Sequence, residues 1–592
     1  MALFISLLLS FAAVRGFRFE ITANYIKLVD LYSFGWLLLF FTLVWTLHRV
    51  ITQKNKRLSA HAALFALIIS TFSVFGESIA KMRRISWIWV SRNYLLNFLN
   101  LYFAHFILYF CAAYLAFQWL ESHPDWEQYQ QKARFSFRKT LLWWGILFLC
   151  YLPWYLYLYP GMLSPDSGTQ ISDAITTGTL NDHHSAFLDL VIRAILVPVK
   201  NLTGSLRIGV GICTLLQMMI LTFAFGFCYE WMRQYVRNKL LRGITFLWFA
   251  FLPVHNLYSV TLWKDILFSV CFLFLLLTLD SAARDEGAFF RSRKKQTALF
   301  LTLLLLPLMR HNGLSVTLVT AVYLFFRFKT YRRQTALIGI IALAAFGLWD
   351  FVILPALHTT KVAPAHVYSV QEQQIVRVLD ERRNELSAEE RNELEGYFKL
   401  PEIWTVYNPV LSDPVKNQFN NEKFSKDPGK FLSLWLSLGL RYPIVYLEAL
   451  LMNNYGFWTP EINYWYSDFY MAESAQIEDI HPAPVWKSAI IEKIFNWFRS
   501  YEFLKTPLVL HLFNAGSCFW IWIFCGVRCL YQNRNKFVLF VPGFALWLGL
   551  LVAPLANDFR YAYGLFVSLP LLMAVTLTTQ QKAEFNDTSP DR

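Results

Sequence analysis

A polar stretch directly after an apolar segment at 141–158 carries the residues best suited to chemistry in this chain. The stretch reads Tyr159-Pro-Gly-Met-Leu-Ser-Pro-Asp-Ser-Gly168. Its prolines and Gly161 end the preceding helix and predict a turn. Asp166 lies between two serines, of which Ser167 is suited to cap a following helix. A carboxylate fixed beside a long apolar segment is a candidate general base, although an ordinary capped turn would have the same composition.

Other polar turns in the chain carry charge next to apolar segments. The loop after Asp166 continues into Asn181-Asp-His-His-Ser185. Three later turns are Trp263-Lys-Asp265, Arg310-His-Asn-Gly313 and Asn557-Asp-Phe-Arg-Tyr561. Charge in such places is costly and tends to face a cavity. Taken singly, each turn has an ordinary explanation as an interfacial ion pair, a snorkelling arginine or a helix cap.

Taken together, these turns predict a binding site. They supply one acid, Asp166, and three cations, which are Lys264, Arg310 and Arg560. One acid beside three cations describes a site that binds an anionic group and activates a hydroxyl. Because arginine binds phosphate through two parallel hydrogen bonds, a membrane-bound phosphate ester is the anion that this set favours.

The composition places most of the chain in a membrane. Of its 592 residues, 56% are hydrophobic and only 16% are charged, whereas soluble proteins carry about 25% charged residues. The net charge of +14 fits basic cytoplasmic loops, and no basic segment has the context of a nucleic-acid-binding module. We therefore expect a protein in contact with membrane lipids and not with nucleic acid.

Apolar segments of suitable length predict an all-α polytopic membrane protein with about 14 transmembrane helices. The segments lie at about 1–14, 32–50, 62–75, 97–120, 141–158, 208–228, 244–260, 262–279, 298–308, 314–326, 336–354, 508–530, 537–552 and 564–577. The first is either a weak span or an uncleaved signal-like start, because it is short and has no basic residues before it. The segment at 187–200 is too short to cross comfortably and carries Asp189 and Arg193 four residues apart, so we expect a helix at the membrane surface.

Basic clusters define the expected topology. Under the positive-inside rule six of them fall on the cytoplasmic side, with Lys81–Arg84 as an exception. The Asp166 loop and a polar region fall on the opposite side. The expected organisation is an N-terminal transmembrane block at 1–139, a transmembrane core at 140–355 with a first external loop at 160–206, a mostly helical extracytoplasmic domain at 356–506, C-terminal helices at 507–579 and a disordered cytoplasmic tail at 580–592.

Between about residues 140 and 580 the chain resembles the GT-C superfamily of integral-membrane glycosyltransferases, in particular its large, uncharacterised bacterial members. The resemblance rests on the order of a span, an external loop with an Asp, many spans, a late aromatic external region and a final Arg-Tyr turn. The matching motifs are Tyr159-Pro-Gly-Met-Leu-Ser-Pro-Asp-Ser167, Trp263-Lys-Asp265, Arg310-His-Asn-Gly313, Tyr455-Gly-Phe-Trp-Thr-Pro460 and Arg560-Tyr561.

The resemblance implies a GT-C-like fold and an inverting transfer of a sugar from a polyprenyl-phosphate donor to a glycan, lipid or protein acceptor. The reaction would serve cell-envelope assembly on the extracytoplasmic face of a bacterial plasma membrane. Asp166 would be the catalytic base or would position the acceptor. The implied substrate-binding residues are Lys264, Arg310 and Arg560 for the leaving phosphate, His183, His184 and His311 for protons or phosphate, and Asp265, Tyr561 and Trp458.

Two alternatives stay open at this point. Many members of the superfamily have paired acids in the first loop, but here Ser167 follows Asp166 and the next acid is Asp173. A divalent cation is therefore neither required nor excluded, no other cofactor is implied, and no residue is assigned to a metal. The alternative function is a transporter or flippase of lipid-linked sugars, which would need access from both sides of the membrane. Whether the acid and the three cations meet at one place is the observation that bears on these alternatives.

Overall fold

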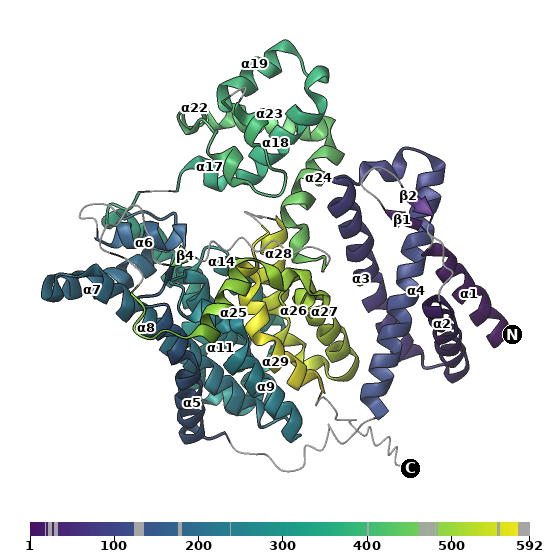
Figure 1. Ribbon diagram of the computed structural model, residues 1–592, viewed down its shortest axis with the longest axis horizontal. Coiled ribbons are helices and arrows are strands. Elements are labelled where there is room, and N and C mark those ends of the chain that lie inside the picture. Colours follow the sequence, from purple (N-terminus) through teal and green to yellow (C-terminus); the bar gives the residue numbers. More distant parts are fainter. Residues whose placement is uncertain are drawn as a thin grey trace.

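The computed structural model is almost entirely helical (Figure 1). It describes residues 1–17, 19–21, 26–28, 34–122, 135–175, 180–236, 238–360, 362–399, 402–460, 470–471, 480, 483–552 and 557–577. A central bundle of helices carries a separate helical lobe above it, and an N-terminal group of helices stands beside it. The predicted tail at 580–592 lies outside the described residues.

The long apolar helices make this a polytopic membrane protein. Within the described ranges, 8 helices are long and apolar enough to cross a membrane, or up to 10 if each of two bent pairs is one span. The eight are Phe34–Gln53, Lys56–Met82, Arg92–Ser122, Phe137–Tyr157, Leu206–Met232, Lys264–Arg284, Lys329–Ala356 and Phe559–Thr576. The bent pairs are 239–251 with 253–259, bent by 41°, and 428–441 with 443–457, bent by 106°.

The expected 14 spans include shorter helices. The segments 1–14, 314–326 and 537–552 fall on apolar helices of fewer than 18 residues. The segment 298–308 belongs to a helix of 17 residues, and the segment 508–530 is divided between two helices. Length and composition therefore support many spans, and the number 14 stays a prediction.

The N-terminal group of helices is tied to the lobe. Its elements are α1 (Ala2–Gly16), β1 (Phe19–Ile21), β2 (Ile26–Leu28), α2 (Phe34–Gln53), α3 (Lys56–Met82), η1 (Ser86–Trp89) and α4 (Arg92–Ser122), with β1 and β2 antiparallel. Glu448 in the lobe accepts hydrogen bonds from the backbone of Ile85 and Ser86 at 2.7 and 2.8 Å. Arg377 bridges the same Glu448 at 3.1 Å and the Arg83 carbonyl at 2.7 Å. The basic exception at 81–84 thus lies where the lobe attaches.

The central bundle begins with the helices on either side of the Asp166 loop. Its elements are α5 (Phe137–Tyr157), β3 (Met162–Leu163), α6 (Pro165–Ile175), α7 (Ala186–Thr203), α8 (Leu206–Met232), α9 (Lys239–Phe251), α10 (Pro253–Ser259), α11 (Lys264–Arg284), α12 (Glu286–Arg291), α13 (Arg293–Met309), α14 (Gly313–Arg327), η3 (Lys329–Tyr331), α15 (Arg332–Leu348), the π-helical η4 (Trp349–Ile353) and α16 (Leu354–Ala356). The surface helix predicted at 187–200 corresponds to α7, which runs across the edge of the bundle in Figure 1. Asp189 on α7 is buried and accepts from Gln170 Nε2 at 2.9 Å, which ties α7 to α6.

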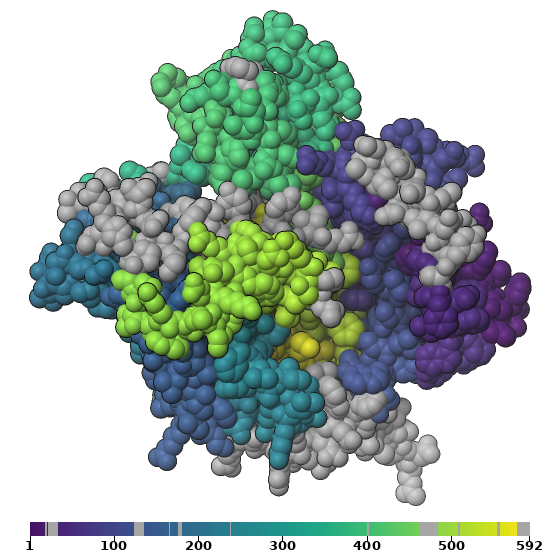
Figure 2. Space-filling model, viewed as in Figure 1, coloured from purple at the N-terminus to yellow at the C-terminus, as the bar shows by residue number. Residues whose placement is uncertain are grey.

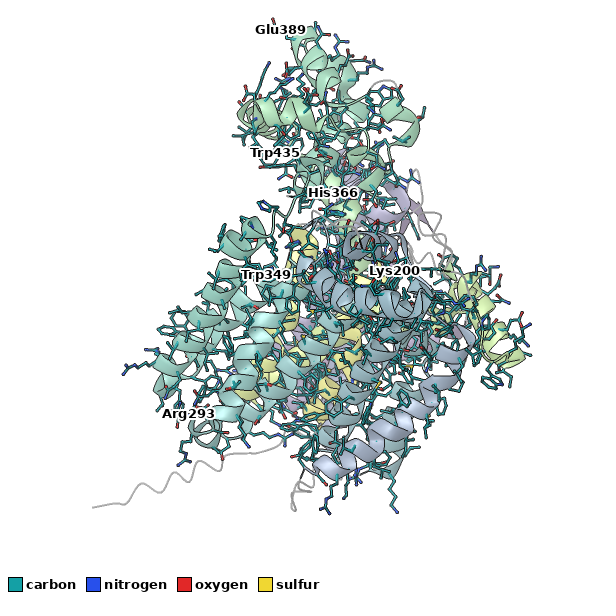
Figure 3. The ribbon with its side chains drawn as sticks, turned by 90° about the vertical axis from the view of Figure 1, so that its left-hand side faces the viewer. Lys200, Arg293, Trp349, His366, Glu389 and Trp435 are labelled. Atoms are coloured by element: carbon teal, nitrogen blue, oxygen red, sulfur yellow. The ribbon has the colours of Figure 1, made fainter. Side chains whose placement is uncertain are left out.

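The lobe, residues 364–457, has a hydrophobic core of its own. Its elements are α17 (Pro364–Val367), α18 (Ser369–Arg382), η5 (Arg383–Glu385), α19 (Ala388–Tyr397), α20 (Glu402–Val406), α21 (Asp413–Lys416), α22 (Asn421–Lys426), α23 (Pro428–Arg441), α24 (Pro443–Asn454) and η6 (Tyr455–Phe457). Its core runs from Ala365 to Tyr446, and Figure 2 shows it as a projection above the bundle. Figure 3 places Glu389 and Trp435 in the lobe and Arg293 at the opposite end of the molecule.

The C-terminal elements return to the bundle core. They are β4 (Tyr470–Met471), α25 (Ala489–Arg499), η7 (Glu502–Lys505), α26 (Pro507–Leu512), α27 (Ala515–Gln532), η8 (Arg534–Leu539), α28 (Val541–Val552), η9 (Phe559–Ala562) and α29 (Tyr563–Leu577). β4 pairs antiparallel with β3 beside the Asp166 loop. Ile491, Phe495 and Phe503 pack in the core of the bundle, so the predicted domain at 356–506 contains both the lobe and a segment that belongs to the bundle.

Candidate functional site

The backbone anchors the loop that carries the candidate base. Gly161 has a φ of +137°, and a Cβ there would lie 2.6 Å from Thr214 Oγ1 and 3.0 Å from the Val260 carbonyl oxygen. Glycine alone fits this turn. The amide of Met162 then donates to the Val260 carbonyl at 2.8 Å, and the amide of Leu262 donates to the Met162 carbonyl at 3.2 Å. The loop is therefore fixed to the segment that leads into α11.

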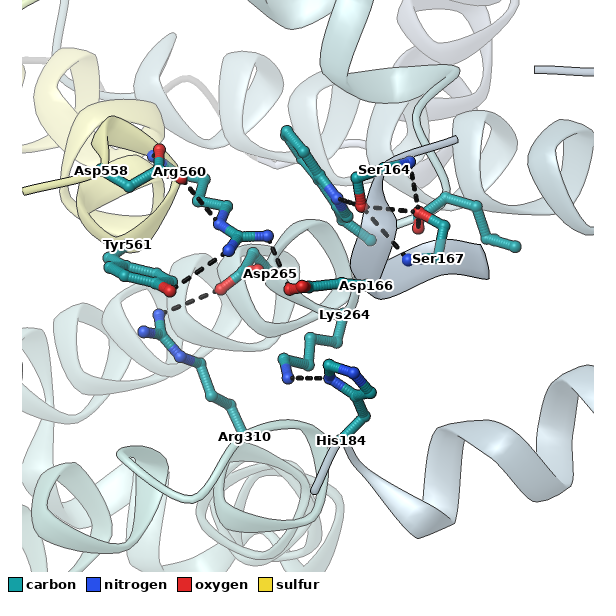
Figure 4. A network of polar contacts seen from close by, with 12 residues as sticks. Ser164, Asp166, Ser167, His184, Lys264, Asp265, Arg310, Asp558, Arg560 and Tyr561 are labelled. Atoms are coloured by element: carbon teal, nitrogen blue, oxygen red, sulfur yellow. Dashed lines mark hydrogen bonds and ion pairs between the residues drawn. The ribbon is translucent and has the colours of Figure 1, made fainter. Parts of the chain in front are cut away.

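Two serines shape the first turn of α6. Ser164 Oγ accepts from the Ser167 amide at 3.2 Å, which is the geometry of an N-cap. Ser167 Oγ donates to the Leu262 carbonyl at 2.6 Å, and Trp263 Nε1 donates to Ser164 Oγ. The prediction that Ser167 caps the helix is therefore wrong, because Ser164 is the cap and Ser167 ties α6 to the start of α11. These bonds fix the position of Asp166 in the first turn (Figure 4).

Arg560 joins the loop to the beginning of α29. Its Nη1 lies 2.7 Å from Asp166 Oδ2, and its Nε lies 2.9 Å from Asp558 Oδ2. Asp558 also accepts from the Arg560 amide at 3.0 Å and so caps η9. The guanidinium is held between two carboxylates. The sequence prediction did not select Asp558, although its position two residues before Arg560 is the signal of a capping acid.

Arg310 and Tyr561 extend the same cluster. Arg310 Nη1 lies 3.1 Å from Asp265 Oδ1. The Arg310 guanidinium lies 4.3 Å from the centroid of the Tyr561 ring, and the Tyr561 hydroxyl accepts from Arg560 Nη2 at 3.2 Å. Gly313 makes the turn after Arg310 tight, since a Cβ there would lie 2.3 Å from the Leu306 carbonyl oxygen. Both arginines are therefore held by stacking and by carboxylates.

Lys264 opens α11 on the other side of Asp166 in Figure 4. Its Nζ donates to His184 Nδ1 at 2.9 Å. Within the part of the chain that the structure describes, Lys264 makes no ion pair within 4.0 Å. Its ammonium group is therefore hydrogen-bonded to an imidazole nitrogen, while Asp166 is near enough for the two charges to interact.

The charges of this cluster are nearly balanced, in contrast to the predicted excess of cations. Asp265 and Asp558 join Asp166 as partners of the arginines. The three acids differ in exposure, because the Asp166 side chain is 28% exposed whereas those of Asp265 and Asp558 are 1% and 3% exposed. Burial alone would raise the pKa of Asp166, but the charges of Arg560 and Lys264 hold that pKa well below its ordinary value. Asp166 is therefore ionised, accessible and neutralised by its neighbours.

The histidine run connects the cluster to the lobe. His183 lies against His184 with ring centroids 4.6 Å apart, and against His366 of the lobe with centroids 4.0 Å apart. Lys416 Nζ lies 3.5 Å from His366 Nδ1. His366 and Lys416 had no signal in the sequence, since nothing along the chain indicates which lobe residues reach the loop.

The remaining predicted site residues have other surroundings. His311 is exposed, and its Nε2 lies 3.2 Å from the Asp182 carbonyl oxygen, near Arg310. Trp458 is buried, packs against Phe72 with tilted rings whose centroids are 5.6 Å apart, and donates to Asn454 Oδ1 at 2.7 Å. Trp458 therefore packs the core between the lobe and the N-terminal helices, and the structure does not bring it into the charged cluster.

The donors in this cluster do not form a metal site. Across the described ranges, no group of three or more His, Cys, Asp or Glu residues is placed to hold a metal ion. The acids of the cluster instead face guanidinium groups. The cluster therefore consists of two guanidinium groups and one ammonium group beside three carboxylates, of which Asp166 is the accessible one.

Comparison with known proteins gives one match. Residues 173–590, more than half of the chain, match the model of a family of unknown function, DUF6020. The match contains the three cations, whereas Asp166 lies just before it. No curated protein and no solved structure matches the chain.

Proposed function

This chain belongs to a family of unknown function, DUF6020, and we propose that it is an inverting membrane glycosyltransferase of the GT-C type. It moves a sugar from a polyprenyl-phosphate donor to a hydroxyl or amine of a glycan, lipid or protein acceptor. In this proposal the chain has about 14 spans in a bacterial plasma membrane, and the cluster and the lobe face away from the cytoplasm. The observation that supports it most is the meeting of Asp166 with three cations from distant segments, next to membrane helices.

The two arginines are suited to a lipid phosphate. Arg310 and Arg560 share Tyr561, which stacks on one guanidinium and accepts from the other. Their buried partners Asp265 and Asp558 keep both guanidinium groups in place. Groups fixed before the reaction neutralise the charge that grows on a leaving phosphate without the cost of rearrangement.

Asp166 is the partner that a donor phosphate would displace. It is the most exposed of the three acids, and it shares Arg560 with the proposed phosphate position. A base whose pKa is held low is weak. Once a phosphate takes the guanidinium, the carboxylate is released, its pKa rises towards the ordinary value, and it becomes a stronger base. Donor binding thus activates the base.

The transfer step then balances in atoms and charge. The acceptor oxygen attacks the anomeric carbon and forms the new bond. The bond between that carbon and the phosphate oxygen breaks, and its electron pair leaves with the lipid phosphate. The proton of the acceptor passes to Asp166 and later to water. A single base opposite a held leaving group gives inversion, whereas retaining enzymes use two carboxyl groups about 5 Å apart.

The residues at the opposite end of α11 favour a transferase over a flippase. There Asp280 accepts from Trp231 Nε1 at 2.7 Å and from Arg284 Nε at 2.8 Å, and Tyr235 donates to the same carboxylate. Lys536 of η8 donates to the Tyr235 hydroxyl at 3.3 Å. These residues, the Arg284 cluster, join α8, α11 and η8. Alternating access would have to break this cluster, whereas a transferase leaves it intact.

The test is a comparison of lipid extracts from three strains, one lacking the protein and the others complemented with the wild type or with Asp166→Asn. We expect mass spectrometry to find an unused polyprenyl-phosphate sugar in the first and third strains and a missing sugar on their surface glycans. A flippase would also cause accumulation in cells, so the purified protein is then supplied with that lipid in vesicles, together with surface glycan from the strain lacking the protein as the acceptor. Release of free polyprenyl phosphate that depends on this glycan supports transfer. Retention of the intact lipid-linked sugar in the presence of the glycan contradicts it.

A further inference from the structure

The contact between the histidine run and the lobe forms a second group of bases outside the charged cluster. The group is a spatial row of three residues: His183 of the loop, His366 of α17 and Lys416 of α21. The ring centroids of the two histidines are 4.0 Å apart, and Lys416 Nζ lies 3.5 Å from His366 Nδ1. Figure 3 places His366 at the base of the lobe, where the lobe meets the bundle. Both imidazoles are partly exposed, so a ligand can reach them.

The backbone holds this contact in place. The amide of Thr360 donates to the Leu180 carbonyl at 2.7 Å, and the amide of Asp182 donates to the Thr360 carbonyl at 3.1 Å. The chain that enters the lobe is thus paired with the chain that enters the histidine run. Because α17 follows this pairing directly, His366 is positioned over His183 by main-chain bonds rather than by the side chains alone.

Among the described residues, this group forms its ion pair with an exposed acid. Lys416 is buried, and its ion-pair partner Asp413 is 56% exposed. Glu372 is buried without a hydrogen-bond partner for either oxygen. Burial raises its pKa to about 9, against the opposing charge of Lys416, and so favours its neutral form. Burial and the neighbouring bases lower the pKa of His183 to about 4, and burial and Lys416 lower the pKa of His366. Three bases that disfavour one another's charge would accept an anion readily.

We propose that His183, His366 and Lys416 form a second anion-binding subsite, which takes a phosphate or carboxylate group of the acceptor. The assignment to the acceptor rests on the proposed transferase function, whereas the binding of an oxyanion does not. Its His183 contacts His184, and Figure 4 shows His184 and Lys264 on the side of Asp166 away from Arg560. A molecule anchored there would approach Asp166 from the face opposite the donor phosphate, as inversion requires.

The experiment titrates the full-length protein, purified in lipid nanodiscs, with inorganic phosphate and separately with acetate. Calorimetry of the wild type should find two phosphate sites. His366→Gln combined with Lys416→Gln should remove one site and leave the other, and Arg560→Gln should remove the other alone. Lys430→Gln is the matched control, because Lys430 is an exposed lysine of the same lobe, paired with Glu393, and should leave both sites unchanged. If acetate competes at the site that the His366→Gln and Lys416→Gln variant removes, the anchored group includes carboxylates. If acetate does not compete there, the group is a phosphate.

The outcomes separate the two proposals. One phosphate site that only Arg560→Gln removes would overturn the subsite and leave the transferase standing. One site that only the lobe variant removes would overturn the donor-phosphate position and support the subsite. Lys416→Arg guards against misfolding, since it keeps the charge and should retain at least part of the lost affinity, and its failure to do so in a folded protein would count against the subsite.

Discussion

The two ends of α11 carry similar charged residues, but these residues differ in their partners and in their exposure. At its last turn, the Arg284 cluster satisfies Asp280 with donors from the protein alone, and Asp280 is fully buried. At its first turn, Lys264 contacts a neutral histidine and lies near Asp166, which is 28% exposed. The ends are about 30 Å apart by the rise of a helix. Charge at the end of a membrane helix is thus insufficient to identify a site, and an accessible acid with displaceable partners is the feature that distinguishes one.

The largest difference between the two ends should follow from Asp166→Asn. Transfer should fall by about 10²–10⁴-fold, the usual contribution of a general base. Phosphate should bind more tightly than to the wild type, because the amide no longer competes for Arg560. Calorimetry with inorganic phosphate and a transfer assay measure the two effects. Unchanged phosphate affinity would mean that Asp166 and the donor do not share the guanidinium.

Arg284→Gln tests the other end. Removing one partner of a buried ion pair costs about 3–5 kcal/mol, so thermal or denaturant unfolding should show a marked loss of stability. Transfer per folded molecule should stay at the wild-type level, because the proposed site lies at the opposite end of α11. A variant that folds normally and fails to transfer would show that the Arg284 cluster takes part in function after all.

Arg560→Gln should weaken the use of the donor substrate more than it lowers the stability of the fold. We expect a loss of about 2–4 kcal/mol in the use of the donor, the scale for removing one stabiliser of developing charge. Asp558→Asn is the companion variant, because it keeps the guanidinium but removes its buried holder, and its effect should be smaller. The dependence of transfer on donor concentration, measured for both variants, checks this order. Equal effects would mean that the position set by Asp558 matters as much as the guanidinium itself.

The smallest effect is a dependence of anion binding on pH. Sulfate keeps its charge between about pH 8 and pH 5.5, so only the protein titrates. The pKa of His183 is lowered to about 4, and that of His366 is also lowered; a bound anion favours the protonated rings and raises both values. Binding therefore takes up protons, and sulfate affinity at the subsite should increase several-fold as pH falls. The groups that face these rings are His184, Lys264, Asp166, Lys416 and Asp413.

The arginine site should respond to pH through Asp558 and not through histidines. Guanidinium groups do not titrate in this range, and the pKa of Asp166 lies well below it, whereas burial raises the pKa of Asp558, the partner of Arg560, to about 7. Calorimetry at several pH values on the Arg560→Gln variant measures the subsite alone. The same measurement on the His366→Gln and Lys416→Gln double variant, the second variant, measures the arginine site alone. In the second variant, adding Asp558→Asn should remove any rise of affinity with falling pH, and a rise that remains would contradict the assignment.

Local pattern predicted the positions of helices better than the way they meet. The apolar runs indicated α3, α8 and α11 because lipid demands continuous apolar helices. Asp166, Lys264, Arg310 and Arg560 could be selected because charge beside such helices is costly. The pairing of these cations with buried acids could not be predicted, because Asp558 and Asp265 meet their partners through tertiary packing. For that reason the predicted excess of cations was wrong.

The lobe shows the same limit. The sequence predicted a mostly helical domain at 356–506, and the structure has α18 and α19 among its helices there. The 106° corner between α23 and α24 follows from Pro443, which the sequence marks as a break but not as an angle. The contact of His366 with His183 depends on residues far apart along the chain, so no local signal could predict it.

The attachment of the lobe limits how this protein can be divided. Glu448 lies within the residues that match the family, whereas two of its hydrogen-bond donors, the amides of Ile85 and Ser86, lie outside them. A shortened chain that begins at the Asp166 loop would keep a buried carboxylate and lose those donors, and Arg377 would remain as its counterion. Expression of the shared core by itself should therefore give a lobe that is poorly seated, and supplying residues 1–122 as a separate fragment should restore it.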